Sequence, residues 1–238
     1  MAYEMQFGPI IAHAPDLLQG AISTLSLSAQ SIAIGVSIGL CCAVARTEEP
    51  RLLGKMVATY VEVFRNTPLL VQLFLIYFGL PLIGLRLTAD TSAVFAISLN
   101  LGAYSTEIIR AGLIAIPKTQ VEAGLALGMS RLQVVRHIVL IPALRVIYPA
   151  LTGQLTLTLL GTSIASAISA TELTSAGSKI ESANFRSLET FLTIAAIYIA
   201  LTLAFRFVYW LIGLWLFRRK RPPKPSLIAD IPAAGVAA

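Results

Sequence analysis

The feature that most constrains this chain is a series of apolar segments, each long enough to cross a lipid bilayer. A helix needs about 20 predominantly apolar residues to cross the hydrocarbon core. Because a backbone in lipid must satisfy its own hydrogen bonds, each segment is expected to be helical. The segments are Gly20–Ala45, Met56–Ile83, Thr91–Ile114, Ala143–Ile168 and Leu188–Phe217. The sequence therefore predicts an all-α integral membrane protein with about five transmembrane helices.

Composition supports a membrane protein over a soluble or nucleic-acid-binding one. Of the 238 residues, 56% are hydrophobic and only 13% are charged. The net charge of +6 would suit a nucleic-acid partner, but the basic residues cluster in short segments beside apolar runs. That placement is a topology signal of membrane proteins, so we expect no nucleic-acid partner. The adjacent Cys41 and Cys42 are interpreted as small core residues, not as a disulfide or metal site.

Lysine and arginine are distributed unequally between the two sides of the predicted spans. One side carries Arg46, Arg51, Lys55, Lys118, Arg131, Arg136, Arg218, Arg219, Lys220, Arg221 and Lys224, and the other carries Arg86, Lys179 and Arg186. The positive-inside rule then places the N-terminus outside and the C-terminus in the cytoplasm. We expect a periplasmic segment 1–19, a transmembrane domain 20–217 and a basic, Pro/Ala-rich cytoplasmic tail 218–238. No cleavable signal peptide is expected.

A polar segment at about residues 118–142 separates the third and fourth spans and is expected in the cytoplasm. Thr119 and Glu122 fit a capping box that would open a short helix, and Ser130 with Gln133 fits a second one. Gly128 suits the left-handed position that ends the first helix. The segment thus predicts a helix-turn-helix bent at Gly128. From local physics alone, a well-capped surface turn is the simpler interpretation.

Motifs for catalysis do not occur in the sequence. It contains no phosphate loop, no metal-ligand spacing and no nucleophile elbow. We therefore expect a chain that is not an enzyme, does not hydrolyse ATP itself, and binds no metal or cofactor of its own.

The polar segment resembles the signature loop of permease subunits of bacterial ABC importers. That family's pattern is Glu-Ala-Ala, a following Gly and a later Ile-x-Leu-Pro, and Glu122–Gly124, Gly128 and Ile138 follow it. Gly124 replaces the second alanine, and Pro142 comes one residue late. In the family this loop is the coupling helix that docks in a cleft of the ATPase subunit. The resemblance assigns ATPase coupling to Glu122, Ala123, Gly124, Gly128 and Ser130.

Three further motifs are similar to those of the polar amino acid permeases. They are Glu62–Gln72, Ala103–Arg110 and Thr162–Leu173, in the order that the family shows. Many members carry a lysine where this chain has Leu160, so no role of that lysine transfers. The resemblance covers about residues 17–218 and implies the type I ABC importer permease fold in a bacterial inner membrane.

Two acid–base pairs lie within predicted spans. Glu62 with Arg65, and Glu107 with Arg110, are each three residues apart and share a helix face. Ionisable groups in a span usually face the protein interior or water. Either each pair neutralises itself locally near the cytoplasmic side, or the four form a gate at the inner end of a pathway.

Polar residues near Pro68 are candidates for a substrate pathway. Pro68 removes a helical hydrogen bond and is expected to kink or unwind the span. The freed carbonyls, with Asn66, Thr67 and Gln72, would then contact a zwitterionic substrate, as broken helices do in transporters. The alternative is a kink used for packing, with Thr67 bonded to its own helix.

Further pathway candidates follow the fourth span. Thr162 and Ser163 belong to a small, polar stripe for which helix packing is the favoured role. Glu172, on the outer side, would attract a cationic substrate group or contact a binding protein, although a solvated loop charge is slightly favoured. Arg206 in the fifth span is expected to snorkel or to pair with a carboxylate.

Together these features favour the permease subunit of an ATP-driven importer of polar amino acids. The resemblance implies as partners two ATPase subunits that bind ATP and Mg²⁺, a second permease (self or paralogue) and a periplasmic substrate-binding protein. An ATP-independent channel would explain the charges in the spans but would leave the cytoplasmic helices without a purpose. A structural membrane subunit would leave the polar pathway residues unexplained.

Overall fold

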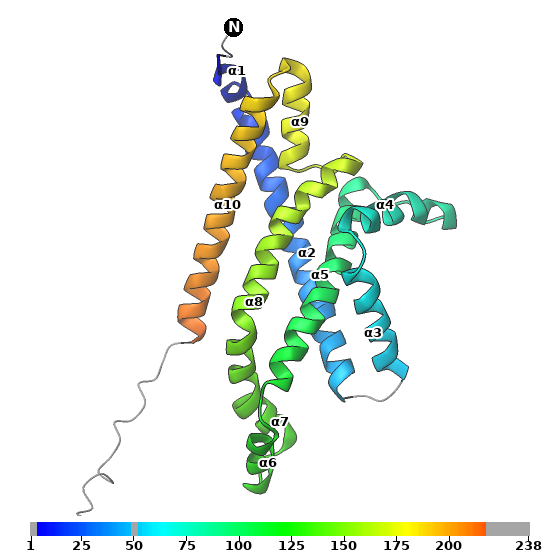
Figure 1. Cartoon of the computed structure of the whole chain (residues 1–238), viewed down its shortest axis with the longest axis vertical. Helices are drawn as coiled ribbons and strands as arrows, with labels where there is room; N and C mark the ends of the chain where they lie inside the picture. The colour runs from blue at the N-terminus through cyan, green and yellow to red at the C-terminus, as the bar shows by residue number, and fades with distance from the viewer. Residues whose placement is uncertain (1–3, 49–51, 218–238) are drawn as a thin grey trace, which may run out of the picture.

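The structure is a computed structural model that describes residues 4–48 and 52–217, and every regular element in these ranges is helical. Four long helices run side by side along the molecule (Figure 1). They are α2 (Ala14–Glu48), α5 (Ala89–Ile114), α8 (Leu140–Gly161) and α10 (Ser187–Leu216). Four helical stretches are long and apolar enough to cross a membrane, and one bent pair makes a possible fifth. The predicted all-α membrane fold is therefore confirmed.

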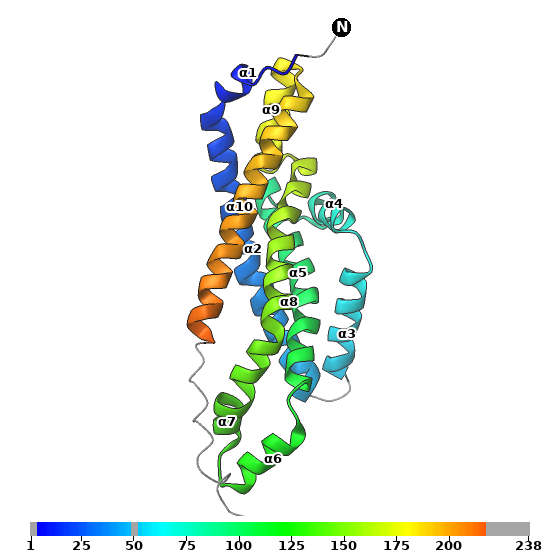
Figure 2. The same ribbon diagram turned by 60° about the vertical axis from the view of Figure 1, so that its left-hand side comes forward.

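Shorter elements connect the long helices. They are α1 (Gly8–Ile11), α3 (Leu52–Arg65), α4 (Leu69–Gly79), η1 (Leu80–Ile83), α6 (Lys118–Ala126), α7 (Arg131–Val134), η2 (Val135–Val139), η3 (Thr162–Ile168) and α9 (Leu173–Asn184). α1 and α9 lie at one end of the bundle, and α6 and α7 lie at the opposite end (Figure 2). We call these the α9 end and the α6 end.

The core forms where α2 packs against α5, the most deeply buried of the long helices. Small residues allow the two backbones to approach closely, as is common between membrane helices. A Cβ atom at Gly39 of α2 would lie only 2.5 Å from the Cβ of Ser105 on α5. A Cβ at Gly35 would likewise lie 2.9 Å from Leu101. This contact makes α2 and α5 the scaffold on which the other elements rest.

The second predicted span, Met56–Ile83, is not one continuous helix. It breaks before Pro68, and the axis turns by 106° between the two pieces. α3 has 14 residues, about 21 Å at 1.5 Å per residue, which is shorter than the hydrocarbon core. α4 then projects sideways from the bundle (Figure 1). The predicted break at Pro68 is therefore confirmed, and it divides the second predicted span into two helices instead of one continuous one, because proline lacks the backbone N–H of a helical hydrogen bond and disfavours helical geometry in the residue before it.

The fourth span is longer than predicted. α7, the π-helical turn η2, α8 and η3 form one candidate span of 38 residues, Arg131–Ile168. Pro142 lies in the first turn of α8, where its missing N–H is tolerated. The second short helix of the predicted helix-turn-helix is therefore the beginning of the fourth span. The predicted tail 218–238 lies outside the described residues.

Candidate functional site

The segment between α5 and α8 forms an exposed bend at the α6 end. We call this bend, which comprises α6, Gly128, α7 and η2, the elbow. Gly128 has φ +81°, the left-handed conformation that was expected there. Ser130 and Gln133 form the predicted capping box, with Ser130 N–H donating to Gln133 Oε1 at 2.8 Å. The capping box at Thr119 was wrong, because α6 begins at Lys118, directly after the extended Pro117. Thr119 and Glu122 therefore lie inside the helix, where Thr119 cannot act as its N-cap.

Gly124 packs the elbow from within. It is buried, and a Cβ atom at this position would lie 2.5 Å from Ile138 Cδ1 and 3.1 Å from Val134 Cγ2. Its small size thus lets α6 lie against α7 and η2, whereas Glu122 and Ala123 face outward. The close approach that the Glu-Ala-Gly motif permits is internal at Gly124, not at an outer contact surface.

Two leucines that were not selected from the sequence dominate the outer surface of the elbow. Leu127 is 82% exposed and Leu132 is 78% exposed, on either side of Gly128. Apolar side chains exposed beside polar neighbours mark contact sites when they lie together. The signal in the sequence was two leucines flanking a turn glycine in an otherwise polar segment.

The acid–base pairs do not form one network of four. Glu107 accepts hydrogen bonds from Arg110, at 2.8 Å, and from Arg46 of α2. Arg46 was expected only as a topology signal, so the structure adds it to this cluster. Within the described residues Glu62 and Arg65 form no ion pair. Instead Glu62 accepts from Asn66, and the Arg65 guanidinium lies 5.4 Å from the centre of the Tyr104 ring.

The two pairs also lie at different depths. Glu107 is seven residues from Ile114, the last residue of α5 at the α6 end, or about 10 Å along the helix. Arg65 ends α3 beside Tyr104, which is ten residues from Ile114, or about 15 Å. Glu107 and Arg110 therefore lie nearer the α6 end than Arg65 does. The role of the four residues in an inner gate stays a prediction.

Gln72 closes the corner between α3 and α4. Its side chain is 5% exposed, and its amide nitrogen lies 2.8 Å from the Phe64 carbonyl and 3.0 Å from the Thr67 carbonyl. Its amide oxygen accepts a hydrogen bond from Asn100 of α5 at 3.0 Å. The carbonyls released by the break are thus bonded within the chain, and Gln72 fixes the corner to α5.

Asn66 and Thr67 bond back to α3. Asn66 Nδ2 donates to the Glu62 carbonyl, and Thr67 Oγ1 donates to the Val63 carbonyl, both at 2.8 Å. This is the packing alternative for Thr67, although both side chains remain exposed at the break.

Thr162 and Ser163 also bond to their own helix. Thr162 is fully buried and donates to the Leu159 carbonyl, while the half-buried Ser163 donates to the Leu160 carbonyl. The Thr162 side chain is therefore not open to a passing solute in this structure.

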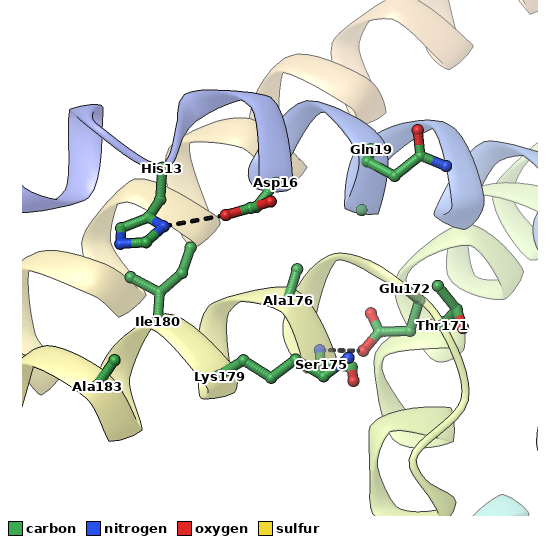
Figure 3. A pocket seen from close by; sticks show the side chains of 11 residues that line it. His13, Asp16, Gln19, Thr171, Glu172, Ser175, Ala176, Lys179, Ile180 and Ala183 are labelled. Carbon is green, nitrogen blue, oxygen red and sulfur yellow. Dashed lines mark hydrogen bonds and ion pairs between the residues drawn. The ribbon is translucent and has the colours of Figure 1, made fainter.

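Glu172 is a buried helix cap, not a solvated loop charge. It is 1% exposed and accepts from the backbone N–H of Thr174 at 2.7 Å. It also accepts from the backbone N–H of Ser175 at 2.5 Å (Figure 3). The Tyr198 hydroxyl donates a third hydrogen bond at 2.9 Å. Burial nevertheless raises the pKa of the Glu172 carboxyl above its usual value. Because α9 needs this cap, Glu172 is not free to bind a substrate in this structure.

A polar pocket of about 330 Å³ lies beside Glu172 at the α9 end. It forms between the start of α2 and α9, and His13, Asp16, Gln19 and Lys179 are among the residues that line it (Figure 3). His13 Nδ1 and Asp16 Oδ2 are 3.0 Å apart. The pocket thus presents charges of both signs to the surroundings of the α9 end.

The family model for "Binding-protein-dependent transport system inner membrane component" matches residues 35–221. The chain belongs to this family. It is therefore a multi-pass permease subunit of an inner-membrane ABC transporter, and such a subunit is not itself the ATPase.

Curated relatives of this permease match most of its length. The glutamine transport system permease protein GlnP of Escherichia coli K12 is 39% identical over 196 residues, covering 82% of this chain and 90% of that protein. The octopine permease OccM of Rhizobium meliloti is 36% identical, covering 90% and 91%. The L-cystine permease TcyB of Bacillus subtilis is 37% identical, covering 83% and 80%.

Solved structures agree with the permease fold. A crystal structure of an amino acid ABC transporter with histidines matches with a TM-score of 0.81 and 36% identity, covering 88% of this chain and 98% of that chain. The MetNI methionine ABC transporter, in an inward-facing conformation, matches with a TM-score of 0.73 at 21% identity, covering 86% and 98%. The second likeness supports the fold alone.

Proposed function

We propose that this permease imports polar amino acids that a periplasmic binding protein delivers. The observation that carries the proposal is the exposed elbow at Gly128, which continues without a break into the fourth span. The curated relatives are named for glutamine, octopine and cystine, all of which are polar amino acids or their derivatives. Two partner ATPase subunits would bind ATP and Mg²⁺, so this chain needs no cofactor of its own.

The elbow would act as a mechanical contact. Leu127 and Leu132 would enter an apolar cleft of the ATPase, with Glu122, Ala123 and Ser130 around them. Gly124 and Ile138 hold α6 against the start of the fourth span, so a displacement of α6 would move that span. Because α8 packs against α5, the displacement would reach the α3–α4 corner that Gln72 fixes to α5.

The pathway would pass the broken second span. Asn66 and Thr67 remain exposed there and present an amide and a hydroxyl suited to a zwitterion. Glu107, held between Arg46 and Arg110, would stand nearer the cytoplasm as part of an inner gate. In this arrangement Gln72 positions the corner and does not contact substrate.

The α6 end would lie in the cytoplasm and the α9 end in the periplasm. The positive-inside rule supports this orientation, since the basic residues cluster toward the α6 end in sequence. A second permease, of the same or a paralogous chain, would cover α4, whose outer side exposes Leu70, Val71, Phe74, Leu75 and Phe78.

Reconstitution tests the proposed function. The chain is co-expressed with the products of its neighbouring genes, purified, and placed in liposomes with ATP inside and labelled glutamine, arginine or cystine outside. We expect an ATPase to co-purify, and uptake to require both ATP and the binding protein. Passive flux without either partner would instead support the channel alternative.

A further inference from the structure

Arg206 is a positively charged residue within the fifth span, and it forms no ion pair with a carboxylate in the described part of the chain. It is exposed on α10, and no ion pair in that part includes it. An arginine in a span is costly unless it reaches an opposite charge or the interface. Of the two expectations for Arg206, a carboxylate partner is not seen within the described residues, which leaves the membrane interface.

A groove of about 650 Å³ surrounds Arg206 between α8 and α10. Its lining includes Tyr148, Thr152, Gly153, Arg206, Tyr209 and Trp210, of which only Arg206 carries a full charge. The hydroxyls of Tyr148 and Thr152 already donate to backbone carbonyls. The guanidinium is thus the one charged group in a groove whose other side chains are aromatic, aliphatic or hydroxyl-bearing.

Space for a ligand is present at Gly153. A Cβ atom built there would meet no atom within 4 Å. α10 itself lies at the periphery of the bundle beside α8 (Figures 1 and 2). Trp210 and Trp215 are 57% and 75% exposed on α10. The groove is therefore open laterally, on the side where lipid surrounds a single permease.

α10 has 30 residues, more than the ~20 that cross the hydrocarbon core, so part of the helix extends beyond that core. A span of about 20 residues counted from Phe191, the first aromatic residue after the buried Glu189, ends at Trp210. Trp210 and Tyr209 would then form part of the aromatic belt at the α6 end. Arg206 lies one helical turn inside Trp210, which is within the reach of a snorkelling arginine. Its guanidinium would thus meet lipid phosphates and not acyl chains.

We propose that this groove binds the phosphate headgroup of an anionic phospholipid in the leaflet at the α6 end. Arg206 pairs with the phosphate, and Trp210 packs against the glycerol and upper acyl carbons. The sequence that follows α10 contains Arg218, Arg219, Lys220 and Arg221, which would raise the local concentration of anionic lipid. The lipid would fill the space between α8 and α10 and hold α10 to the bundle. That this leaflet is the cytoplasmic one rests on the orientation proposed above.

Native mass spectrometry of the complete transporter tests the site. The complex is incorporated into bilayers of equal parts phosphatidylcholine and phosphatidylglycerol, extracted, and scored for the lipid that remains bound. Wild type should retain phosphatidylglycerol over phosphatidylcholine by about fivefold, the effect expected for one matched charge near a membrane surface. Arg206→Gln should abolish the preference and Arg206→Lys should keep most of it. Lys55→Gln removes a charge from an exposed site on α3 and should leave it unchanged.

A second variant does not depend on the charge. Gly153→Leu fills the groove with Arg206 still present, and it should lower total lipid retention at least as much as Arg206→Gln. If both variants retain phosphatidylglycerol as wild type does, the proposal is wrong. If Arg206→Gln instead separates the two permeases and leaves lipid retention unchanged, the partner of Arg206 is a carboxylate of the second permease and not a lipid. The melting temperature of the complex separates a lipid site from a free-anion site. If inorganic phosphate, added to the complex in phosphatidylcholine, raises this temperature as much as phosphatidylglycerol does, the site binds a free anion.

These readouts do not depend on transport. Retention is measured on the purified complex, so a failure to import amino acids leaves the lipid result standing. Conversely, loss of the lipid preference in wild type would not affect the family membership or the coupling role of the elbow.

Discussion

The two ends of this permease differ in how deeply their characteristic side chains are buried. At the α9 end, Glu172 and Glu189 are almost completely buried, and both are hydrogen-bonded. At the α6 end, Glu122 and Leu127 face outward, with no covering element from the described chain. The comparison suggests that the α9 end is built to keep its shape, whereas the α6 end is built to be contacted and moved.

The connections between helices follow the same division. At the α9 end, Arg186 joins the buried Glu189 at 2.7 Å and the side chain of Gln6 at 3.0 Å, so the N-terminal segment is tied to the start of α10. At the α6 end, hydrogen bonds stay within the turn of the elbow, whereas α6 lies against η2 through the apolar contact of Gly124 with Ile138. Directional bonds resist displacement, while an apolar contact can slide.

Loss of the Glu189 carboxylate should have the largest effect on stability. Glu189→Ala leaves Arg186 and the Gln6 backbone N–H without their acceptor, in a site that is 0% exposed. Removing one partner of such a pair is expected to cost about 3 kcal/mol. Thermal unfolding of the purified complex measures the loss. Glu4→Ala, at an exposed position in the same segment, is the control and should change stability by less than about 0.5 kcal/mol. Equal effects of the two variants would show that the α9 end is not fixed by this cluster.

Gln72→Leu changes a residue of the α3–α4 corner, which lies between the two ends, and should have the next largest effect on stability. It leaves the carbonyls of Phe64 and Thr67 and the amide of Asn100 without their partner, at a cost of about 2 kcal/mol. Uptake should fall with stability, because the corner would lose its attachment to α5. Gln30→Leu replaces an exposed glutamine that donates to Ser26 of its own helix, and serves as the control. A stable Gln72→Leu transporter with normal uptake would show that the corner does not need this residue.

Much of this architecture could be predicted from the sequence, because bilayer thickness imposes a strong length requirement. The apolar runs identified the long helices, and Pro68 identified the break. The size of the 106° bend could not be predicted, since the corner also contacts other helices, as in the hydrogen bond between Gln72 and Asn100 of α5. Local capping gave one success, at Ser130, and one failure, at Thr119, where the preceding proline decided the helix start.

The candidate site was less predictable, because the spacing of residues along the sequence does not indicate which side chains of different helices form hydrogen bonds or ion pairs. The i, i+3 rule correctly joined Glu107 with Arg110, yet it also joined Glu62 with Arg65, which have other partners. Arg46 reaches Glu107 from 61 residues away. Likewise, the burial of Glu172 depends on the packing of α9 against α2 and α10, which its loop position in the sequence did not reveal.

Changing the elbow should affect coupling with little effect on folding. Leu127→Glu places a charge on a side chain that is 82% exposed, so stability should change by less than about 0.5 kcal/mol. If Leu127 enters an ATPase cleft, its loss should weaken association by about tenfold, as for an interface residue worth more than 1 kcal/mol. Titration of the purified permease with the ATPase measures this. Gln120→Glu adds the same charge at an exposed polar position of α6 and should have a smaller effect.

The smallest predicted effect is a pH dependence that belongs to the α9 end alone. Glu172 lies between the fourth and fifth candidate spans, and its pKa is raised above 4.5 because burial disfavours the charged form. The folded state therefore binds this proton more tightly than the unfolded state, so the associated stability is present at low pH and is lost as pH rises through the folded pKa. Glu172→Gln removes that titration.

The comparison of melting temperatures between wild type and Glu172→Gln isolates this group from all other carboxylates. As pH increases from the acidic range toward neutral, wild type should lose stability relative to Glu172→Gln. Glu122→Gln, on the exposed face of α6, should run parallel to wild type throughout. A wild-type advantage that grows with pH would mean that the three hydrogen bonds to the Glu172 carboxylate outweigh its burial. In that case the α9 end would be held by a charged cap, and its rigidity would increase, not decrease, toward neutral pH.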